Sequence, residues 1–175
     1  MRLNFKKQMR AVVISLLIMG LSFAGCTKKP EAVTERCLET KSLAEFTDIL
    51  EGYRNGVLAN RNGEKMRTQI MTFSFAEGNR AYFCTTSDKP VYEQLVASPY
   101  VSYCTFPEDF EPVLSLNGTV VFVADRDIIE QALESNYYAK RNFKSADNPV
   151  LRVFYIDVEE IETYSSEGTN VYAAK

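Results

Sequence analysis

The chain has 175 residues and a hydrophobic content of 46%, which is enough for one buried core and too little for two ordinary domains. Its 20 basic and 23 acidic residues leave a net charge of -3. We therefore expect no nucleic-acid partner, because binding to a phosphate backbone draws on a surplus of Lys and Arg. The absence of histidine and of any CxxC pair excludes the common structural zinc sites.

Residues 1–25 have the pattern of a secretion signal. A basic start is followed by an apolar run from Ala11 to Phe23 and then by the small residues Ala24 and Gly25. The run is shorter than the roughly 20 residues that a membrane-spanning helix needs. An uncleaved membrane anchor and an ordinary secretory signal are the alternatives.

The signal ends in FAGC, which resembles the lipobox of bacterial lipoproteins, although Phe23 replaces the usual aliphatic residue. The resemblance implies that Cys26 is diacylated and becomes the N-terminus. We therefore expect an exported, cell-envelope lipoprotein that is anchored to a membrane at Cys26. Residues 26–41 would be a polar tether, residues 42–164 the domain and residues 165–175 a C-terminal tail.

The domain begins with a helix over residues 42–53, where apolar residues recur at helical spacing behind Ser42. Ser42 and Glu45 have the spacing of a capping box. A first strand follows from Val57 to a hairpin turn at Asn62-Gly63. Further strands are expected over residues 66–75, 80–85, 101–106, 113–124 and 150–164, and further helices over residues 89–97, 125–135 and 137–143.

Six strands that are joined mostly by hairpins cannot form a parallel sheet. They favour an antiparallel barrel or sandwich with helices at its edges.

The cysteines of the domain are expected to be free. If Cys26 is acylated, Cys37, Cys84 and Cys104 remain, and an odd number cannot pair completely within one chain. Cys84 and Cys104 stand in apolar, strand-like runs, where a free cysteine behaves as a small buried hydrophobe. A disulfide between these two is the alternative for an exported protein.

The third strand ends in hydroxyl-bearing residues and is followed at once by Lys89, which begins a helix. The first turn of a helix offers free backbone N–H groups and a positive dipole end, both of which favour an anion. Thr85 and Ser87 would add hydroxyl donors, and Lys89 would add a charge. The competing interpretation is that these residues only cap the helix.

A second cation stands in the preceding strand, where Arg67, Gln69 and Met71 share one face. The hairpin between the two strands would bring Arg67 near Thr85 and Lys89. A phosphate held between the two cations and the hydroxyls is the hypothesis, although surface Arg and Lys are mostly solvated.

The order of elements now resembles a known family. The stretches GVLANRNGEKMRTQIMTF, RAYFCTTSDKPVYEQLVASPYVSYCTF, VLSLNGTVVFVAD and NPVLRVFYIDVEEIE are similar to the pyridoxamine 5'-phosphate oxidase-like, FMN-binding split-barrel family, and most of all to its small clostridial-type members. The resemblance covers residues 42–164. It implies a mainly β fold, a six-stranded antiparallel split β-barrel with flanking helices, and a homodimer with FMN between the subunits.

The resemblance also implies which residues would hold the cofactor. Arg67 and Lys89 would bind the FMN phosphate, with Ser87 as a further contact. Thr68, Gln69 and Ile70 would run alongside the ribityl chain and the edge of the ring, partly through backbone groups, and Cys84 and Thr85 would line the cofactor at the end of the third strand.

The chain departs from true pyridoxamine phosphate oxidases in ways that concern the substrate. Pro112-Val113 replaces an Arg-Gln pair, and without Trp or His the C-terminal substrate motif is missing. We therefore expect FMN binding without oxidation of pyridoxamine phosphate. The expected function is that of an envelope-anchored oxidoreductase, which passes electrons from a reduced donor to a small acceptor through the flavin. No residue is singled out as catalytic.

Two rival interpretations remain. One is a binding module on the same fold, for flavin, deazaflavin or haem, although the lack of histidine removes the commonest haem ligand. The other is a structural lipoprotein with an empty barrel.

Overall fold

The computed structural model describes residues 38–175, so the predicted signal, Cys26 and Cys37 lie outside the described part of the chain. Six antiparallel strands in this part close into a barrel, because β7 pairs with β4 along one edge and with β6 along the other. The order around the barrel is β7-β4-β3-β2-β5-β6, which confirms the expected six-stranded barrel. The strands are β2 (Asn55–Asn62), β3 (Lys65–Glu77), β4 (Arg80–Thr86), β5 (Tyr100–Thr105), β6 (Val113–Phe122) and β7 (Leu151–Ser165).

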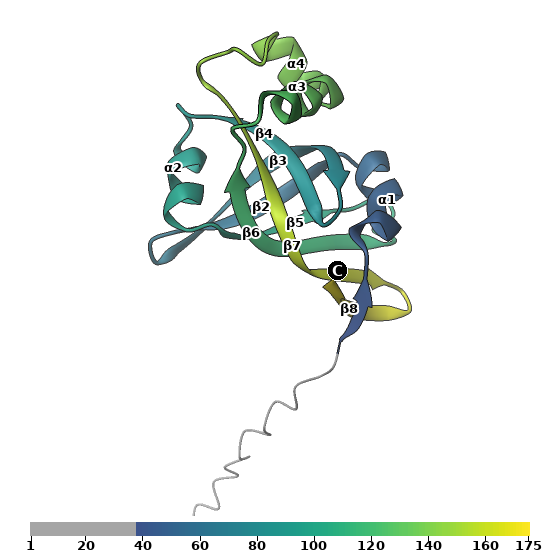
Figure 1. The fold of residues 1–175 in the computed structure, drawn as a ribbon. Helices are drawn as coiled ribbons and strands as arrows, with labels where there is room; N and C mark the ends of the chain where they lie inside the picture. Colours follow the sequence, from purple (N-terminus) through teal and green to yellow (C-terminus); the bar gives the residue numbers. More distant parts are fainter. Residues whose placement is uncertain (1–37) are drawn as a thin grey trace, which may run out of the picture. The chain divides into compact units, whose positions relative to one another are not determined.

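Helices flank the barrel (Figure 1). The expected first helix begins with the capping box at Ser42, whose backbone N–H donates to Glu45 Oε1 at 3.0 Å. It divides into a 3₁₀ turn, η1, and a short α-helix. The helical elements are η1 (Leu43–Phe46), α1 (Thr47–Gly52), α2 (Pro90–Ala97), α3 (Arg126–Ser135) and α4 (Tyr137–Phe143). None of the helices within residues 38–175 has the length and hydrophobicity to span a membrane.

Two short strands differ from the sequence-based expectation. β8 (Gly168–Ala174) lies in the segment expected to be a tail, and β1 (Glu39–Lys41) lies at the end of the expected tether. β8 extends the hairpin from β7, and β1 pairs parallel to β8. The Tyr172 ring packs against Phe46, with 5.8 Å between the centroids. These strands depend on contacts with β7 and η1, which their own short sequences do not show.

Aromatic side chains form the centre of the core. The Phe83 ring is fully buried and lies 4.7 Å from the Tyr103 ring and 5.5 Å from the Phe154 ring, centroid to centroid. Such pairs add about 0.5 to 1.5 kcal/mol each beyond the burial of their area. Since these three rings come from β4, β5 and β7, they hold opposite walls of the barrel together.

β3 and β4 separate part of the way along the barrel. They pair only over Phe73–Glu77 of β3 and Arg80–Phe83 of β4. Before Phe73, β3 continues with β2 alone, and after Phe83, β4 continues with β7 alone. The barrel is therefore split between these two strands, and α4 lies beside the opening.

Cys84 and Cys104 are both free, as expected, so the alternative disulfide does not form. Cys84 Sγ lies 3.8 Å from Ser74 Oγ and donates to the Ala132 carbonyl oxygen at 3.8 Å. Because burial disfavours the thiolate, the pKa of Cys84 is raised to about 11. The Cys84 thiol is thus neutral near pH 7.

Candidate functional site

The separation of β3 from β4 leaves a pocket of 140 Å³, called the split pocket below. Ile70, Met71 and Thr72 of β3 form one wall, and Cys84 and Thr85 of β4 form the other. The remaining lining residues are Lys89, Asn136, Tyr138, Ala139, Asn142 and Phe143. The split pocket therefore brings together Ile70, Cys84, Thr85 and Lys89 of the residues expected from sequence.

Thr85 is the most informative residue of the split pocket. Its side chain is only 2% exposed, and Oγ1 has no hydrogen-bond partner within the described chain. A buried hydroxyl without a partner costs about 1 to 3 kcal/mol. Native proteins rarely keep such a group without a reason, and a ligand bound at this end of β4 is a candidate for the missing partner.

Lys89 lies at the same end of β4 and is the N-cap residue of α2. Its backbone N–H donates to the Thr86 carbonyl oxygen at 3.2 Å, and its carbonyl oxygen accepts from the Tyr92 N–H at 3.0 Å. The backbone of Lys89 is thereby fixed while its side chain stays exposed. Pro90 occupies the first turn of α2, so that turn has one N–H group fewer to offer an anion.

Ser87 does not line the split pocket. Its backbone N–H and its hydroxyl both donate to the Val150 carbonyl oxygen, at 2.8 Å and 3.4 Å. The hydroxyl would have to give up this bond to contact a phosphate.

Arg67, Thr68 and Gln69 also lie outside the lining of the split pocket. Arg67 and Thr68 are exposed on the part of β3 that pairs only with β2. Gln69 Nε2 donates to Asn60 Oδ1 at 2.8 Å, and this hydrogen bond links the side chains of β3 and β2. Arg67 lies on the expected strand, but it does not line the pocket that contains Thr85 and Lys89.

The free edge of β3 is a second source of polar groups. From Lys65 to Thr72, β3 pairs with β2 on one side and has no strand partner on the other within residues 38–175. Unpaired strand edges present backbone N–H and C=O groups that need partners. A planar, polar ring system lying along this edge would find both donors and acceptors.

Asn136 is a site residue that the sequence analysis missed. It is 4% exposed, and its Nδ2 donates to the Thr72 carbonyl oxygen at 3.1 Å and to Ser74 Oγ at 3.2 Å. Its Oδ1 caps α4 by accepting from the Ala139 N–H at 3.0 Å. An Asn between two predicted helices is a recognisable N-cap signal, but the contact with β3 required the structure.

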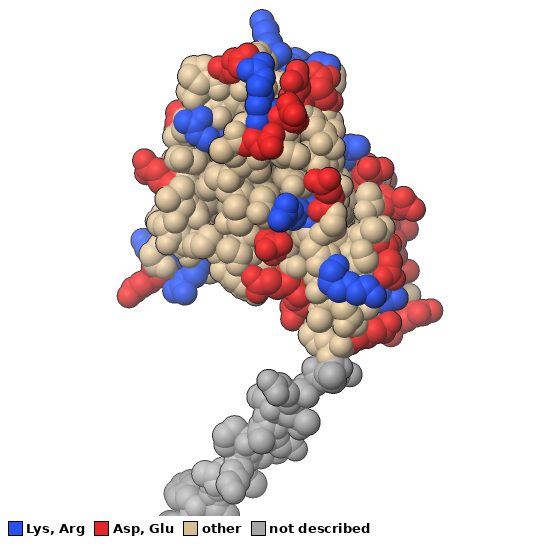
Figure 2. Space-filling model, viewed as in Figure 1, with Lys and Arg blue, Asp and Glu red and all other residues tan. Residues whose placement is uncertain are grey.

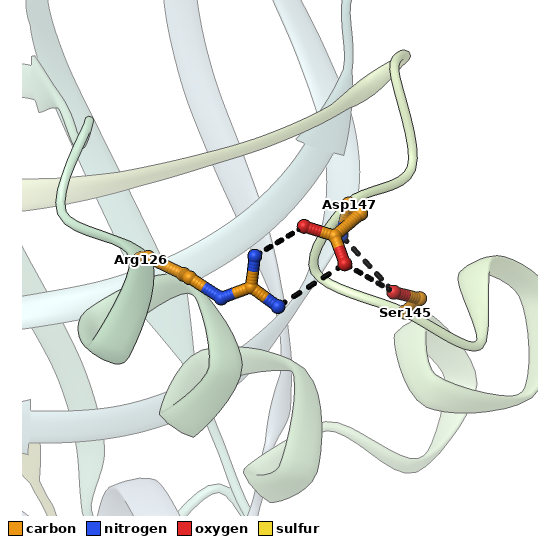
Figure 3. A network of polar contacts seen from close by, with 3 residues as sticks. All are labelled: Arg126, Ser145 and Asp147. Carbon is orange, nitrogen blue, oxygen red and sulfur yellow. Dashed lines mark hydrogen bonds and ion pairs between the residues drawn. The ribbon is translucent and has the colours of Figure 1, made fainter.

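The loop that follows α4 is tied to α3 by an exposed network (Figure 3). Arg126 forms a bidentate ion pair with Asp147, whose backbone N–H donates to Ser145 Oγ at 3.1 Å. The guanidinium of Arg126 lowers the pKa of the Asp147 carboxyl. The network holds the loop that carries Val150, the acceptor for Ser87.

A larger hollow of 600 Å³ lies between the β2–β3 hairpin and α2. It contains none of the residues expected to hold a cofactor, and its wall includes the exposed residues Arg61, Asn62 and Glu93. No group of His, Cys, Asp and Glu within residues 38–175 is arranged to hold a metal ion. Figure 2 shows acidic and basic side chains interspersed on one face, without a continuous basic surface there.

Comparison with known proteins provides independent evidence of the family to which the chain belongs. Residues 44–165 match the family model described as Pyridoxamine 5'-phosphate oxidase. The comparison with curated proteins finds no match.

Several solved structures share the fold. A NimC/NimA family protein from Clostridium acetobutylicum has a TM-score of 0.64 at 21% identity, over 73% of this chain and 91% of its own. General Stress Protein 26 from Bacillus anthracis has a TM-score of 0.61 at 21% identity, over 69% and 91%. A heme binding protein from Mycobacterium smegmatis has a TM-score of 0.63 at 15% identity, and the match covers 74% of this chain and 56% of that one.

Proposed function

The chain belongs to the pyridoxamine 5'-phosphate oxidase family, and from that premise we propose that it is an FMN-binding oxidoreductase that reduces a small acceptor. The observation that carries the proposal is that Thr85, whose buried Oγ1 has no hydrogen-bond partner within residues 38–175, lines the split pocket together with the exposed Lys89. A phosphorylated ligand would provide an acceptor for the hydroxyl and a counter-charge for the ammonium group. The residues present therefore fit the cofactor that is typical of the family.

FMN would supply the transfer of electrons or hydride, and the protein would supply binding, orientation and exclusion of water. In this proposal Lys89 and Thr85 hold the phosphate, with Arg67 and Ser87 as further contacts. The free edge of β3 along Thr68, Gln69 and Ile70 would bind the ring through backbone groups. The Cys84 thiol is a poor base or nucleophile near pH 7, because burial raises its pKa to about 11, and we assign no catalytic side chain.

The substrate is not proposed to be pyridoxamine phosphate. The chain lacks both tryptophan and histidine, and it has Pro112-Val113 where true oxidases carry Arg-Gln. These differences from true oxidases favour a different small molecule as the acceptor of electrons from the reduced flavin.

A second copy of the chain is proposed to complete the site. The split pocket of 140 Å³ is smaller than the roughly 300 to 1,000 Å³ typical of ligand pockets. Beside it, Ile70 is 76% exposed and Tyr138 is 50% exposed, which is apolar surface suited to a subunit interface. Sedimentation of the flavin-loaded protein at micromolar concentration should show a dimer, and a monomer with flavin fully bound would contradict this.

Anchoring in the cell envelope is proposed from the lipobox-like FAGC. The variant Cys26→Ser should leave the precursor unprocessed or release the protein from membranes. Unchanged processing together with unchanged membrane fractionation would remove the lipoprotein interpretation.

Haem binding is the second candidate, since one structural relative is described as a heme binding protein. The absence of histidine leaves only Tyr, Met or Cys as axial ligands and disfavours it. The visible absorption spectrum of the purified protein separates the candidates. Two flavin bands support the proposal, a Soret band supports haem, and a colourless protein that rejects added FMN supports an empty barrel.

A further inference from the structure

Arg54 lies between α1 and β2 and is held in place at both ends. Its backbone carbonyl oxygen accepts from the Phe73 N–H at 2.7 Å and from the Tyr103 hydroxyl at 3.0 Å. Its guanidinium Nη1 donates to the carbonyl oxygens of Ser74 at 2.9 Å and Ser135 at 3.0 Å. The charged group is thus fixed by β3 and α3, unlike a solvated surface arginine.

The charge of Arg54 has no carboxylate partner. None of the ion pairs within residues 38–175 includes Arg54. Of its nitrogens only Nη1 is hydrogen-bonded within the described chain, so Nε and Nη2 remain as donors. A fixed guanidinium with free donors matches the geometry of a carboxylate or a similar anion.

Arg54 lines a pocket of 350 Å³, called the Arg54 pocket below, which is large enough for a small organic molecule. Thr72, Asn136 and Tyr138 line both the Arg54 pocket and the split pocket, so the two are neighbours with a shared wall. Tyr137 also lines the Arg54 pocket, and this residue is 69% exposed. Exposed tyrosine rings offer flat surfaces on which a planar ligand can stack.

We propose that the Arg54 pocket binds a small planar organic anion, which is the substrate class of the oxidoreductase. The Arg54 guanidinium would bind the anionic group, and Tyr137 and Tyr138 would contact the planar body. The shared wall would then place the planar body next to a flavin in the split pocket. The substrate role rests on the proposed function, whereas the anion site itself rests only on the geometry of Arg54.

Glu51 provides an internal control. It lines the same pocket with an exposed side chain and forms no ion pair with Arg54. Its carboxylate would repel a bound anion without contributing to the bonds that hold Arg54. Replacing it by Gln should therefore strengthen anion binding and leave the fold unchanged.

The test compares two probes of the same shape, naphthalene-2-carboxylate and the neutral naphthalene-2-carboxamide, by isothermal titration calorimetry of the purified protein at low salt. We expect the carboxylate to bind the parent about tenfold more tightly than the amide, since a hydrogen bond to a charged group is the main difference. Arg54→Gln should remove this preference. Glu51→Gln should tighten carboxylate binding about two- to threefold and leave amide binding unchanged. If Arg54→Gln fails to fold, the Glu51→Gln result alone tests the anion site.

Equal binding of the two probes to the parent would overturn the proposal, and so would a carboxylate affinity that does not respond to Glu51→Gln. The titration is repeated with protein saturated with FMN. Continued binding of the probe supports two separate, neighbouring pockets. Displacement of the probe by FMN would overturn the proposal that the two pockets are separate. A protein that binds the carboxylate through Arg54 but rejects FMN would keep the anion site and refute the flavin function.

Discussion

Gln69 Nε2 donates a 2.8 Å hydrogen bond to Asn60 Oδ1, and Asn60 is fully buried. Asn60 Nδ2 in turn donates to Gln94 Oε1 at 3.0 Å, so one chain of amides connects β3, β2 and α2. The resemblance to flavoproteins assigned Gln69 to the cofactor. Since its side-chain amide donates to Asn60, we expect Gln69 to contact the cofactor through its backbone.

Gln69→Ala should therefore reduce stability more than it reduces FMN binding. The change leaves the buried Asn60 Oδ1 without its donor, which costs about 1 to 3 kcal/mol. Urea unfolding should show this loss, while titration with FMN of the folded variant should show an affinity within about twofold of the parent. A large loss of FMN affinity at unchanged stability would instead show that the Gln69 side chain contacts the cofactor.

Lys89→Ala should weaken FMN binding by roughly ten- to a hundredfold, because a charge-assisted contact with the phosphate is lost. Arg67→Ala should do the same if both cations bind the phosphate. Riboflavin has the same ring without the phosphate, so its weaker binding should be nearly indifferent to either change. The melting temperature of each variant serves as the control for folding. FMN affinity that stays within about twofold of the parent in a folded variant would place the phosphate elsewhere.

Thr85→Val should separate stability from binding. Valine keeps the β-branched shape in β4 and removes the buried hydroxyl that lacks a partner, so the ligand-free fold should be at least as stable as the parent. FMN binding should weaken about tenfold, because the contact to the phosphate is gone. A hydroxyl with only a structural role would give the opposite result, with lower stability and unchanged affinity.

The Cys84 thiol should make stability fall at alkaline pH. Its pKa is raised from 9.0 to about 11 in the folded protein, mainly by burial. Between these pH values the unfolded chain releases the proton while the folded chain keeps it, so the free energy of unfolding decreases as pH rises. Comparison of the parent with Cys84→Ala by urea unfolding between pH 8 and 11 isolates this contribution, expected to be on the order of 2 kcal/mol. Parallel pH profiles for the two proteins would show that Cys84 does not titrate as described.

Much of this fold could be predicted from local signals. The capping box at Ser42, the turn at Asn62-Gly63 and the alternation of apolar residues along the strands all depend on neighbours in sequence. These signals led to six antiparallel strands in a barrel or a sandwich, and the family resemblance implied the barrel, which the structure confirms. β1 and β8 were not predictable in the same way, because their few residues become strands only through contact with β7 and η1.

For the site, the sequence alone showed which residue types were available, namely hydroxyls and a lysine where β4 leads into α2, and it carried the family resemblance. Which of them meet was decided by tertiary structure. The register between β3 and β4 ends at Phe73 and Phe83, and this separation creates the pocket that contains Thr85 and Lys89 and leaves Arg67 outside. Asn136 and Arg54 line the two neighbouring pockets because they form hydrogen bonds with residues distant in sequence. Hydrogen bonds across such separations follow from how the chain packs, so no local pattern around either residue could show them.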